Sequence, residues 1–478
     1  MKNISYLDMV KELLDESEFS EFEKCYNNPV KKSIKILNHR WYKNNKSDLH
    51  SIVKWILSQE RDLAEPGFSY NWNKYNDVLF ATRKENLKSA SLWSHYLHQA
   101  WLIYVQEMSA SLSVQVLWVQ PWDIVLDMCA APWWKSIQIA DKLQDWFLIS
   151  NEIDSWRRKA LESNLHRCGI YNVWVMQQDW CIIWDKLPEN FDKVLVDAPC
   201  SWEWMQYKSD KKVWQRDEKK SRKLSNLQIK LLISWLKSLK AWGELVYSTC
   251  TTNVLENEYV ISEVLKQYWD AVQLMEVPLD EKSDWISNWR WNEILSPGNA
   301  EKVARLWPHI NQTWWFFIAK FKKVASLLIK KEEVCSKVTS ENIRNNLSEW
   351  WIDSTSNLGF FTSKYTINIA PKSLIQKQFE NTISNIEIWL PVFKIVKDNK
   401  NNTDKLVPLI WIAQTFWHIA TKNVIEISNE QLKSLMDKRD LIDDGLGEYE
   451  WNYVILERNW VWLWLISIQK WIWKNKCF

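Results

Sequence analysis

The chain has 478 residues, of which 46% are apolar and 25% charged, which is enough for two or three domains with a substantial core. Its 61 basic and 59 acidic residues leave a formal net charge of +2, so the overall charge indicates neither a nucleic-acid nor a membrane partner. The start of the chain lacks the apolar stretch of a signal peptide, and no apolar run reaches the roughly 18 residues of a membrane span. Eight cysteines are too few for a disulfide framework, so we expect a cytoplasmic protein.

Three regions follow one another along the chain. Residues 1–105 mix acidic helical segments with short apolar runs, which is typical of a small α+β domain. In residues 106–324, apolar strands alternate with helical stretches, a pattern that predicts a doubly wound parallel sheet of the α/β class. Residues 335–478 hold short strands separated by turn residues, and we expect a small β-barrel-like domain there.

Glycine and tryptophan occur at unusual frequencies, with 7 glycines and 37 tryptophans in the chain, whereas glycine makes up about 7% of average proteins. Several tryptophans lie beside strand-like runs, where a turn calls for glycine: Trp122, Trp146, Trp242, Trp314 and Trp315. Some bacteria read the codon UGA as glycine, whereas other code tables read it as tryptophan. We therefore predict that many printed tryptophans stand for glycine, but that Trp55 and Trp307, in apolar non-turn contexts, are true. The alternative is a genuinely tryptophan-rich protein.

The first candidate site is the segment VLDMCAAPWWKS, residues 125–136. A strand that ends in Asp127 is followed by small residues, a proline and a helix, which is the layout of a ligand site at the carboxyl end of a parallel sheet. If Trp133 and Trp134 are glycines, the backbone can approach a ligand at the N-terminus of the helix. As printed, two indoles would fill that space.

Two acidic residues follow the next two strands. Glu152 ends the second predicted strand of the sheet, and Asp179 ends the third. In nucleoside-binding sheets, an acid after the second strand typically binds ribose hydroxyls, and one after the third lies near the adenine. The alternative is that both are solvated carboxylates at the starts of loops.

Two cysteines follow apolar strands at the same edge of the predicted sheet. Cys200 lies in LVDAPCSWEWM, and Cys250 lies in LVYSTCTTNVLENE. Neither has the CxxC or nearby-histidine spacing of a metal site, so we expect no metal. Because two cysteines converge on one ligand-bearing edge, a thiol nucleophile is a better interpretation than two buried apolar side chains.

With Trp read as Gly, the segments CAAPWWK, DAPCSWEWM and YSTCTTNVLENE resemble the signature motifs of the Nop/Sun family of RNA cytosine-C5 methyltransferases. The resemblance covers about residues 25–323, and the motifs are highly specific in combination. The C-terminal region is similar to the PUA-like domain of the RsmF-like bacterial branch. The resemblance implies a Rossmann-like class I methyltransferase sheet between an N-terminal α+β RNA-binding domain and a C-terminal PUA-like RNA-binding domain.

The resemblance also implies S-adenosylmethionine as methyl donor and a cytosine in RNA as acceptor. The thiolate of Cys250 would add to carbon 6 of the base and make carbon 5 nucleophilic, and Cys200 would help to release the product. Asp197 would bind the base edge or the amino-acid part of the donor, with Lys135 close to both. The donor contacts of the family fall on Cys129, Ala130, Ala131, Pro132, Trp133, Trp134, Lys135, Glu152, Asp179 and Asp197.

A basic stretch, residues 208–223, follows the Cys200 loop. It is either a track for RNA phosphates or a solvated helix face. We expect the substrate to be ribosomal RNA of the 16S type, either free or in the small ribosomal subunit, and the protein to be a monomer. Transfer RNA is the close alternative, because the same motifs serve both substrates.

Two other functions stay open from the sequence. A DNA cytosine methyltransferase also uses a thiol, but we expect its nucleophile in a PCQ-type loop, so the STC cysteine argues against it. If the tryptophans at positions 133, 134, 202 and 204 are real, the donor site is obstructed. The chain would then be a non-catalytic RNA-binding protein on a decayed methyltransferase fold.

Overall fold

The structure is a computed structural model. It describes residues 6–26, 32–37, 68–72, 78–83, 98, 103–131, 134–143, 146–179, 181, 187–201, 218–279, 288–289, 292–311, 313–326 and the C-terminal strands given below. Four predicted features lie outside the described residues, namely Pro132 with Trp133, Trp202 with Trp204, Trp55, and the first part of the basic stretch, 208–217.

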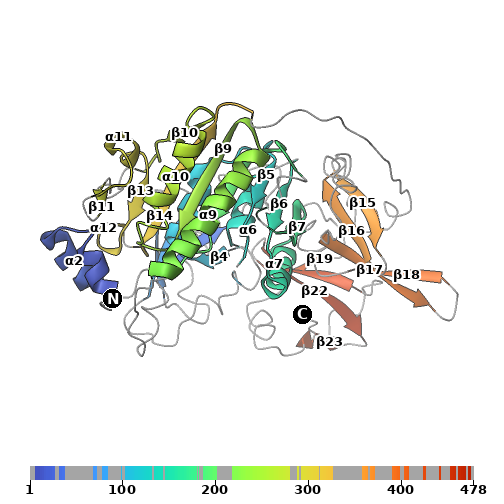
Figure 1. The fold of residues 1–478 in the computed structure, drawn as a ribbon. Helices are drawn as coiled ribbons and strands as arrows, with labels where there is room; N and C mark the ends of the chain where they lie inside the picture. Colours follow the sequence, from blue (N-terminus) through green and yellow to red (C-terminus); the bar gives the residue numbers. More distant parts are fainter. Residues whose placement is uncertain are drawn as a thin grey trace.

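A sheet of eight strands occupies the centre of the described chain (Figure 1). Its strands are β5 (Val125–Asp127), β6 (Leu148–Asn151), β7 (Val173–Met176), β8 (Phe191–Asp197), β9 (Leu239–Thr249), β10 (Val272–Met275), β13 (Ala304–Leu306) and β14 (Phe316–Lys323). The order is β10-β14-β9-β8-β5-β6-β7, with β13 paired to β14. Strands β5 to β9 run parallel to one another, whereas β14 runs antiparallel to β9 and β10, between which it lies.

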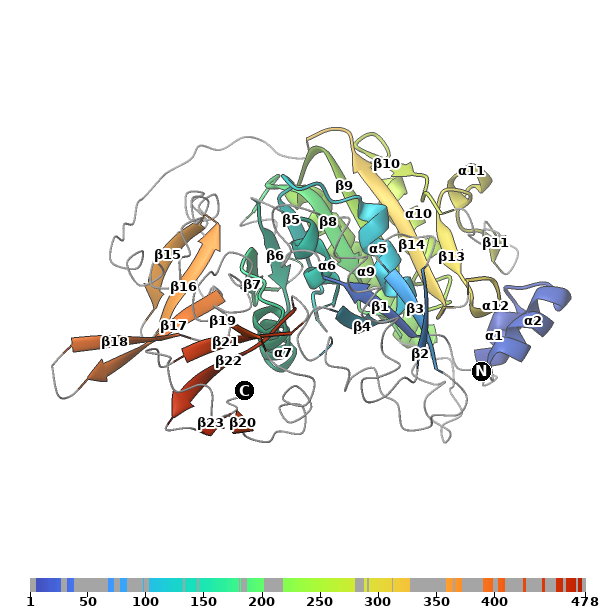
Figure 2. The same cartoon turned by 180° about the vertical axis from the view of Figure 1, so that it is seen from behind.

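Helices cover both faces of this sheet, as Figures 1 and 2 show from opposite sides. They are α5 (Met108–Leu117), α6 (Trp134–Lys142), α7 (Ser155–Arg167), α9 (Glu218–Ser238) and α10 (Glu258–Tyr268). Successive residues of β5 point to opposite faces: Leu126 joins the apolar cluster of α9 and α10, and Val125 joins that of α5, α6 and α7. The predicted doubly wound α/β sheet is therefore confirmed.

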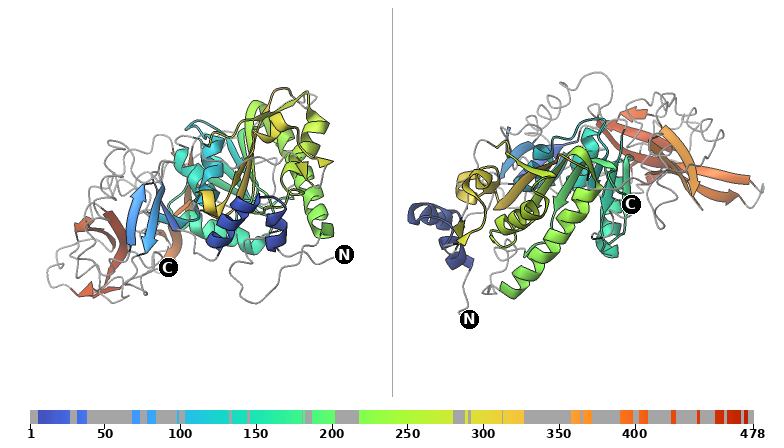
Figure 3. Two further views of the ribbon diagram at one scale, coloured as in Figure 1. Left: turned by 90° about the vertical axis from the view of Figure 1, so that its left-hand side faces the viewer. Right: turned by 45° about the horizontal axis from the view of Figure 1, so that its top comes forward.

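The N-terminal region contains two helices and a small antiparallel sheet of order β2-β3-β1-β4. Its elements are α1 (Tyr6–Lys11), α2 (Glu16–Tyr26), β1 (Lys32–Ile36), β2 (Phe68–Trp72), β3 (Val78–Arg83) and β4 (Ile103–Gln106). Helix α2 packs against α12 (Pro308–Asn311), and the Phe22 ring meets Trp307 edge-on at 5.8 Å between centroids. Figure 3 shows the blue N-terminal helices beside the yellow part of the chain. Strand β1 is tied to α6 by an ion pair of 3.5 Å between Lys35 Nζ and Asp141 Oδ2.

The C-terminal region is made of strands where the structure describes it. One sheet has the order β15-β16-β17-β18, and another has the order β19-β21-β22-β23-β20. The strands are β15 (Leu358–Ser363), β16 (Thr366–Pro371), β17 (Leu390–Asp398), β18 (Thr403–Pro408), β19 (Val424–Glu426), β20 (Leu441–Ile442), β21 (Tyr453–Arg458), β22 (Val461–Gln469) and β23 (Ile472–Lys474). Its likeness to a PUA domain, and the three domain boundaries, stay predictions.

Short elements complete the description, namely β11 (Asn288–Trp289), β12 (Asn292–Glu293) and α11 (Pro297–Ala300). None of the described helices has the length and apolar character needed to cross a membrane.

Two tryptophans adopt a backbone conformation that suits glycine. Trp118 and Trp242 have φ angles of 55° and 70°, and each is 67% exposed. A left-handed backbone is costly for a bulky L-residue and free of strain for glycine. Trp118 also caps the C-terminus of α5, where glycine is the preferred residue. Both positions therefore support the prediction that glycine stands there in the natural protein.

Other tryptophans are well accommodated. Trp307 is 1% exposed, as expected for a true tryptophan. Trp315 departs from the expectation of a turn glycine, because it is 2% exposed and its ring centroid lies 5.0 Å from that of Tyr6. Trp174 and Trp235 are also buried in the core. The surroundings of the tryptophans thus differ from position to position, and the glycine assignment stays a prediction.

Candidate active site

The predicted site residues gather at one edge of the central sheet. Strands β6, β5, β8 and β9 are parallel neighbours, so their carboxyl ends meet at the same edge. The residues at or just after these ends are Asp127, Cys129, Glu152, Asp197, Cys200 and Cys250. Residues that are up to 123 positions apart in the sequence are thereby brought into one region.

Asp127, the last residue of β5, is fully buried. The Ser136 hydroxyl donates a hydrogen bond of 2.6 Å to Asp127 Oδ2, and Ser150 Oγ donates one of 3.1 Å to Ser136 Oγ. Burial raises the pKa of Asp127 to about 7, and the Ser136 bond only partly opposes this. Asp127 Oδ1 has no hydrogen-bond partner among the described residues. Sequence reasoning missed Ser136, whose position in the first turn of α6 was the available signal.

Glu152 is also buried, at 1% exposure, directly after β6. Its Oε1 accepts a hydrogen bond of 3.0 Å from the Asp154 backbone N–H, whereas Oε2 has no hydrogen-bond partner among the described residues. The nearest cation to Oε2 is Arg157 Nη1 at 3.8 Å, and Arg157 Nη2 donates a bond of 2.8 Å to the Ala131 carbonyl. Arg157, which sequence reasoning missed, therefore links Glu152 to the loop after β5.

Asp179 has a different environment from Glu152. It lies three residues beyond β7 and is exposed, and its Oδ1 accepts a hydrogen bond of 2.8 Å from the Cys181 backbone N–H. The interpretation as a solvated carboxylate at a loop start thus fits Asp179 but does not fit Glu152. Asp179 lies at the rim of the candidate site.

The loop after β5 is closely packed. Cys129, Ala130 and Ala131 are buried, and the Ala130 N–H donates a hydrogen bond of 3.1 Å to the Asn151 carbonyl. Burial raises the pKa of the Cys129 thiol well above its usual value, so this cysteine is a poor nucleophile. Trp134 begins α6, is half-buried, and packs against the apolar cluster beneath that helix.

Lys135 and Asp197 form an ion pair at this edge, so the two residues are close together as predicted. The distance between Lys135 Nζ and Asp197 Oδ2 is 2.6 Å, and the Lys135 side chain is 6% exposed. Ser248 Oγ donates a hydrogen bond of 3.1 Å to Asp197 Oδ1. These contacts fix the orientation of the Asp197 carboxylate at the end of β8.

The thiols of Cys200 and Cys250 are in contact. Their sulfur atoms lie 3.1 Å apart, with Cys200 in the loop after β8 and Cys250 directly after β9. Cys200 is buried, whereas Cys250 is partly exposed. The predicted convergence of the two cysteines is therefore present, and it places a partly exposed thiol beside a buried one.

Mild oxidation is expected to join these two thiols. A disulfide needs a sulfur–sulfur distance of about 2.05 Å, so a movement of about 1 Å is sufficient. One equivalent of hydrogen peroxide would remove one hydrogen from each thiol and be reduced to two water molecules. Peptide mapping should then show a Cys200–Cys250 disulfide that dithiothreitol reverses. If alkylating reagents still label both cysteines after oxidation, the thiols are not in contact.

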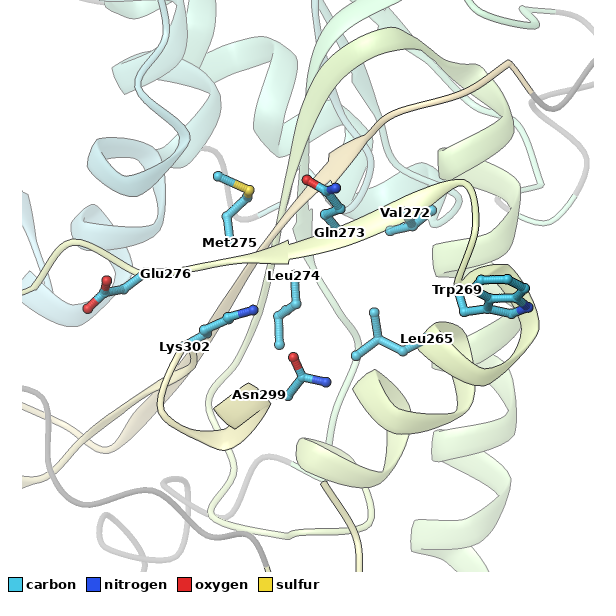
Figure 4. A pocket seen from close by; sticks show the side chains of 9 residues that line it. All are labelled: Leu265, Trp269, Val272, Gln273, Leu274, Met275, Glu276, Asn299 and Lys302. Atoms are coloured by element: carbon cyan, nitrogen blue, oxygen red, sulfur yellow. The ribbon is translucent and has the colours of Figure 1, made fainter. Parts of the chain in front are cut away.

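A hollow lies elsewhere on the surface, at the edge strand β10 (Figure 4). Its lining includes Leu265 of α10, Leu274 and Met275 of β10, and Lys302. None of the predicted site residues lines this hollow. It is therefore separate from the constellation of acids and cysteines.

The parallel strands with one inserted antiparallel strand, and the buried carboxylates at the ends of β5 and β6, have the arrangement of the Rossmann-like fold of methyltransferases. Residues 114–322 match the family model described as 16S rRNA methyltransferase RsmB/F. This segment is thus similar to the RsmB/F group, in agreement with the resemblance to the Nop/Sun family.

Curated relatives agree with this family. The chain is 29% identical over 327 residues to ribosomal RNA small subunit methyltransferase F of Photobacterium profundum. It is 31% identical over 332 residues to the protein of the same name from Erwinia tasmaniensis. Each alignment covers 68% of this chain and 64% of the relative, so the chain spans somewhat less than two thirds of their length.

Solved structures show the same fold. A methyltransferase homologue from Pyrococcus horikoshii is 27% identical, with a TM-score of 0.53, over 64% of this chain and 90% of that one. The structure of NSun6 from the same organism, solved with SFG, is 20% identical, with a TM-score of 0.52, over 68% of this chain and 99% of that one. The second likeness concerns the fold alone.

Proposed function

We propose that the protein transfers a methyl group from S-adenosylmethionine to carbon 5 of a cytosine in the RNA of the small ribosomal subunit. The observation that carries the proposal is the contact of Cys200 and Cys250, at 3.1 Å between sulfurs. This pair lies in a domain that matches the RsmB/F family. The names of the curated relatives support ribosomal RNA over transfer RNA as the substrate.

The buried acids fit the proposed methyl donor. Glu152 Oε2 is a buried acceptor without a hydrogen-bond partner among the described residues, at the position where a nucleoside-binding sheet binds ribose hydroxyls. Ala130 and Ala131 are buried and have small side chains, so a bound donor could approach the backbone of the loop after β5. When bound, S-adenosylmethionine supplies an electrophilic methyl group. Donor binding further requires glycine at positions 133 and 134, which we propose for the natural protein.

The two cysteines divide the chemistry between them. The Cys250 thiolate adds to carbon 6 of the cytosine, which makes carbon 5 nucleophilic toward the methyl group. After methylation, carbon 5 loses its proton and the bond between Cys250 Sγ and carbon 6 breaks. Cys200, in contact with Cys250, assists this release. Asp197, whose carboxylate contacts Lys135 and Ser248, would bind the exocyclic amine of the base or the amino-acid part of the donor.

Replacing Cys200 with alanine tests this division of roles. Cys200→Ala should leave the addition of Cys250 intact but slow product release, so that a covalent protein–RNA adduct accumulates. The adduct is visible as a band of reduced mobility on a denaturing gel. Cys250→Ala and the double variant are the controls, and neither should form the band. An adduct level in Cys200→Ala no higher than in the unsubstituted protein would remove Cys200 from the release step.

The remaining assignments are also proposals. We infer a cytoplasmic monomer in which the N-terminal and C-terminal regions, 1–105 and 335–478, bind RNA around the methyltransferase domain, 106–324. The target base must be unstacked to reach Cys250, because an enzyme cannot reach a ring carbon of a base that is still stacked in folded RNA. Comparing methyl incorporation into small-subunit RNA and transfer RNA distinguishes the two candidate substrates.

One observation favours the non-catalytic alternative. As printed, the Trp134 indole begins α6 and packs against the apolar cluster under this helix, beside the proposed donor site. If this tryptophan is real, the protein should bind RNA without binding S-adenosylmethionine. Calorimetry with the donor and with RNA separates this alternative from the enzyme.

A further inference from the structure

A buried carboxylate, Glu256, lies in the loop between Cys250 and α10. Its exposure is 0%, and its two oxygens accept hydrogen bonds from different loops. Oε2 accepts from the Ser201 backbone N–H at 2.9 Å and from Gln228 Nε2 at 3.3 Å. Oε1 accepts from Asn253 Nδ2 at 3.3 Å. One side chain thus contacts the residue after Cys200 and a residue three positions after Cys250.

Other hydrogen bonds brace the same two loops. Ser201 Oγ donates to Thr251 Oγ1 at 3.0 Å, so the residues that directly follow the two cysteines are joined. Gln228 Nε2, from α9, also donates to the Pro199 carbonyl at 2.9 Å. Ser201 and Gln228 are bonded to Glu256, and Thr251 is bonded to Ser201. The loops are therefore held to each other as well as to the sheet.

A buried ion pair between Arg305 and Glu258 also holds the Cys250 loop. Arg305 forms two bonds of 2.7 Å with Glu258, and its Nη1 donates a bond of 3.0 Å to the Thr252 carbonyl. Both charged side chains are buried, at 3% and 0% exposure. This pair fixes the Thr252 carbonyl independently of Glu256, so Glu256 is left to set the position of Ser201, in the Cys200 loop, relative to it.

We propose that Glu256 is a positioning residue that sets the separation of the Cys200 and Cys250 thiols. This inference rests on the proposed function for its catalytic consequence, but the thiol geometry itself can be measured without RNA. Glu256 makes no contact with either sulfur in the hydrogen bonds described above. It acts through Ser201 on one side and Asn253 on the other. Misplacement of a reacting group by about 1 Å can lower a rate by about 100-fold.

Glutamine is an informative replacement because it has nearly the same shape. A carboxylate accepts hydrogen bonds at both oxygens, whereas an amide has one oxygen and one NH₂ group. The NH₂ group would face either the Ser201 N–H or Asn253 Nδ2, and two donors cannot form a hydrogen bond with each other. Asn253 cannot simply turn over to accept this bond. Its Oδ1 accepts from the Leu255 N–H at 3.1 Å, and its Nδ2 donates to Ser221 Oγ at 2.8 Å. Glu256→Gln therefore loses the hydrogen bond to either Ser201 or Asn253.

The experiment compares Glu256→Gln with the matched control Glu263→Gln, in which a partly exposed glutamate of α10 loses its bond to Lys266. The first readout is the rate at which diamide, a two-electron oxidant, forms the Cys200–Cys250 disulfide in the protein without RNA. The second is methyl transfer at saturating RNA and donor, measured in chains that carry glycine at positions 133 and 134. For Glu256→Gln we expect both rates to fall by about 10- to 100-fold with KM values unchanged. Both rates should be unaffected in Glu263→Gln.

The outcomes separate this inference from the proposed function. An unchanged disulfide rate in Glu256→Gln overturns the positioning role. A reduced disulfide rate in a protein that never methylates RNA supports the positioning role and contradicts the proposed function. If Glu256→Gln does not fold, Glu256→Asp keeps the charge and both acceptor oxygens but withdraws them by one methylene. We expect the same losses in that variant, and unchanged rates in it would equally overturn the inference.

Discussion

Replacing Cys250 with alanine is expected to lower methyl transfer by more than about 1,000-fold, since the reaction loses its nucleophile. Carbon 5 of cytosine is not reactive enough to accept the methyl group until a thiolate has added at carbon 6. Binding of the donor should be almost unchanged, because the predicted donor contacts lie after β5 and β6 and do not include this side chain. Radiolabelled methyl transfer and donor calorimetry on the same preparation measure the two effects.

The matched control for this loss is Cys25→Ala. Cys25 is a partly exposed cysteine of α2, remote in sequence from both cysteine motifs, and its replacement should leave the methylation rate within about twofold. Methylation by Cys250→Ala near the unsubstituted rate would contradict the covalent mechanism. Loss of activity in both variants would instead indicate a general effect on the fold.

The second large effect concerns the printed tryptophans in the donor site. Changing Trp133 and Trp134 together to glycine should strengthen the binding of S-adenosylmethionine by at least about 100-fold. We expect indoles at these two positions to take up space that the donor needs, because an aromatic side chain covers roughly 150–250 Å². Isothermal titration of the printed protein and the double variant measures the difference. Equal affinities would show that the indoles do not obstruct the donor.

Two single variants show how replacing a tryptophan with glycine changes the stability of the fold away from the donor site. Trp242→Gly should stabilise the fold, because it relieves a φ angle of 70° at a 67% exposed indole, a strain of about 1–2 kcal/mol. Trp307→Gly should destabilise it by at least about 3–5 kcal/mol, because this side chain is 1% exposed in an aromatic cluster. In the coding sequence, UGA at codons 133 and 134 with a glycine tRNA that reads it would support the glycine assignment. UGG at both codons would make the indoles real.

The central sheet could be predicted from the sequence because its signal is local. Alternating apolar strands and helical stretches predicted the doubly wound sheet, and the polar residue types after the strands predicted Asp127, Glu152, Cys200 and Cys250 at one edge. Parallel connectivity alone then brings these residues together. That these residues lie at one edge could therefore be predicted without knowing how the side chains pack.

The remaining features depend on tertiary contacts that leave little trace in the sequence. Arg157 acts on Glu152 and on the Ala131 carbonyl only because α7 begins beside the loop after β5. The reach of Glu256 to Ser201 likewise depends on the approach of loops 55 residues apart. Asp179 and Glu152 were equivalent by position, and only burial distinguishes them. Trp315 lies directly before β14, as expected for a turn beside a strand, but its side chain is buried because helix α1 supplies an aromatic neighbour, Tyr6.

The most direct test is methyl transfer by the chain with glycine at positions 133 and 134. The protein would be incubated with methyl-labelled S-adenosylmethionine and unmodified small-subunit ribosomal RNA, and the RNA would then be digested and its nucleosides separated by mass spectrometry. We expect the label in 5-methylcytidine at a defined position, and none with Cys250→Ala in the same background. Label in another nucleoside, or RNA binding without any transfer, would contradict cytosine-5 methylation by this protein.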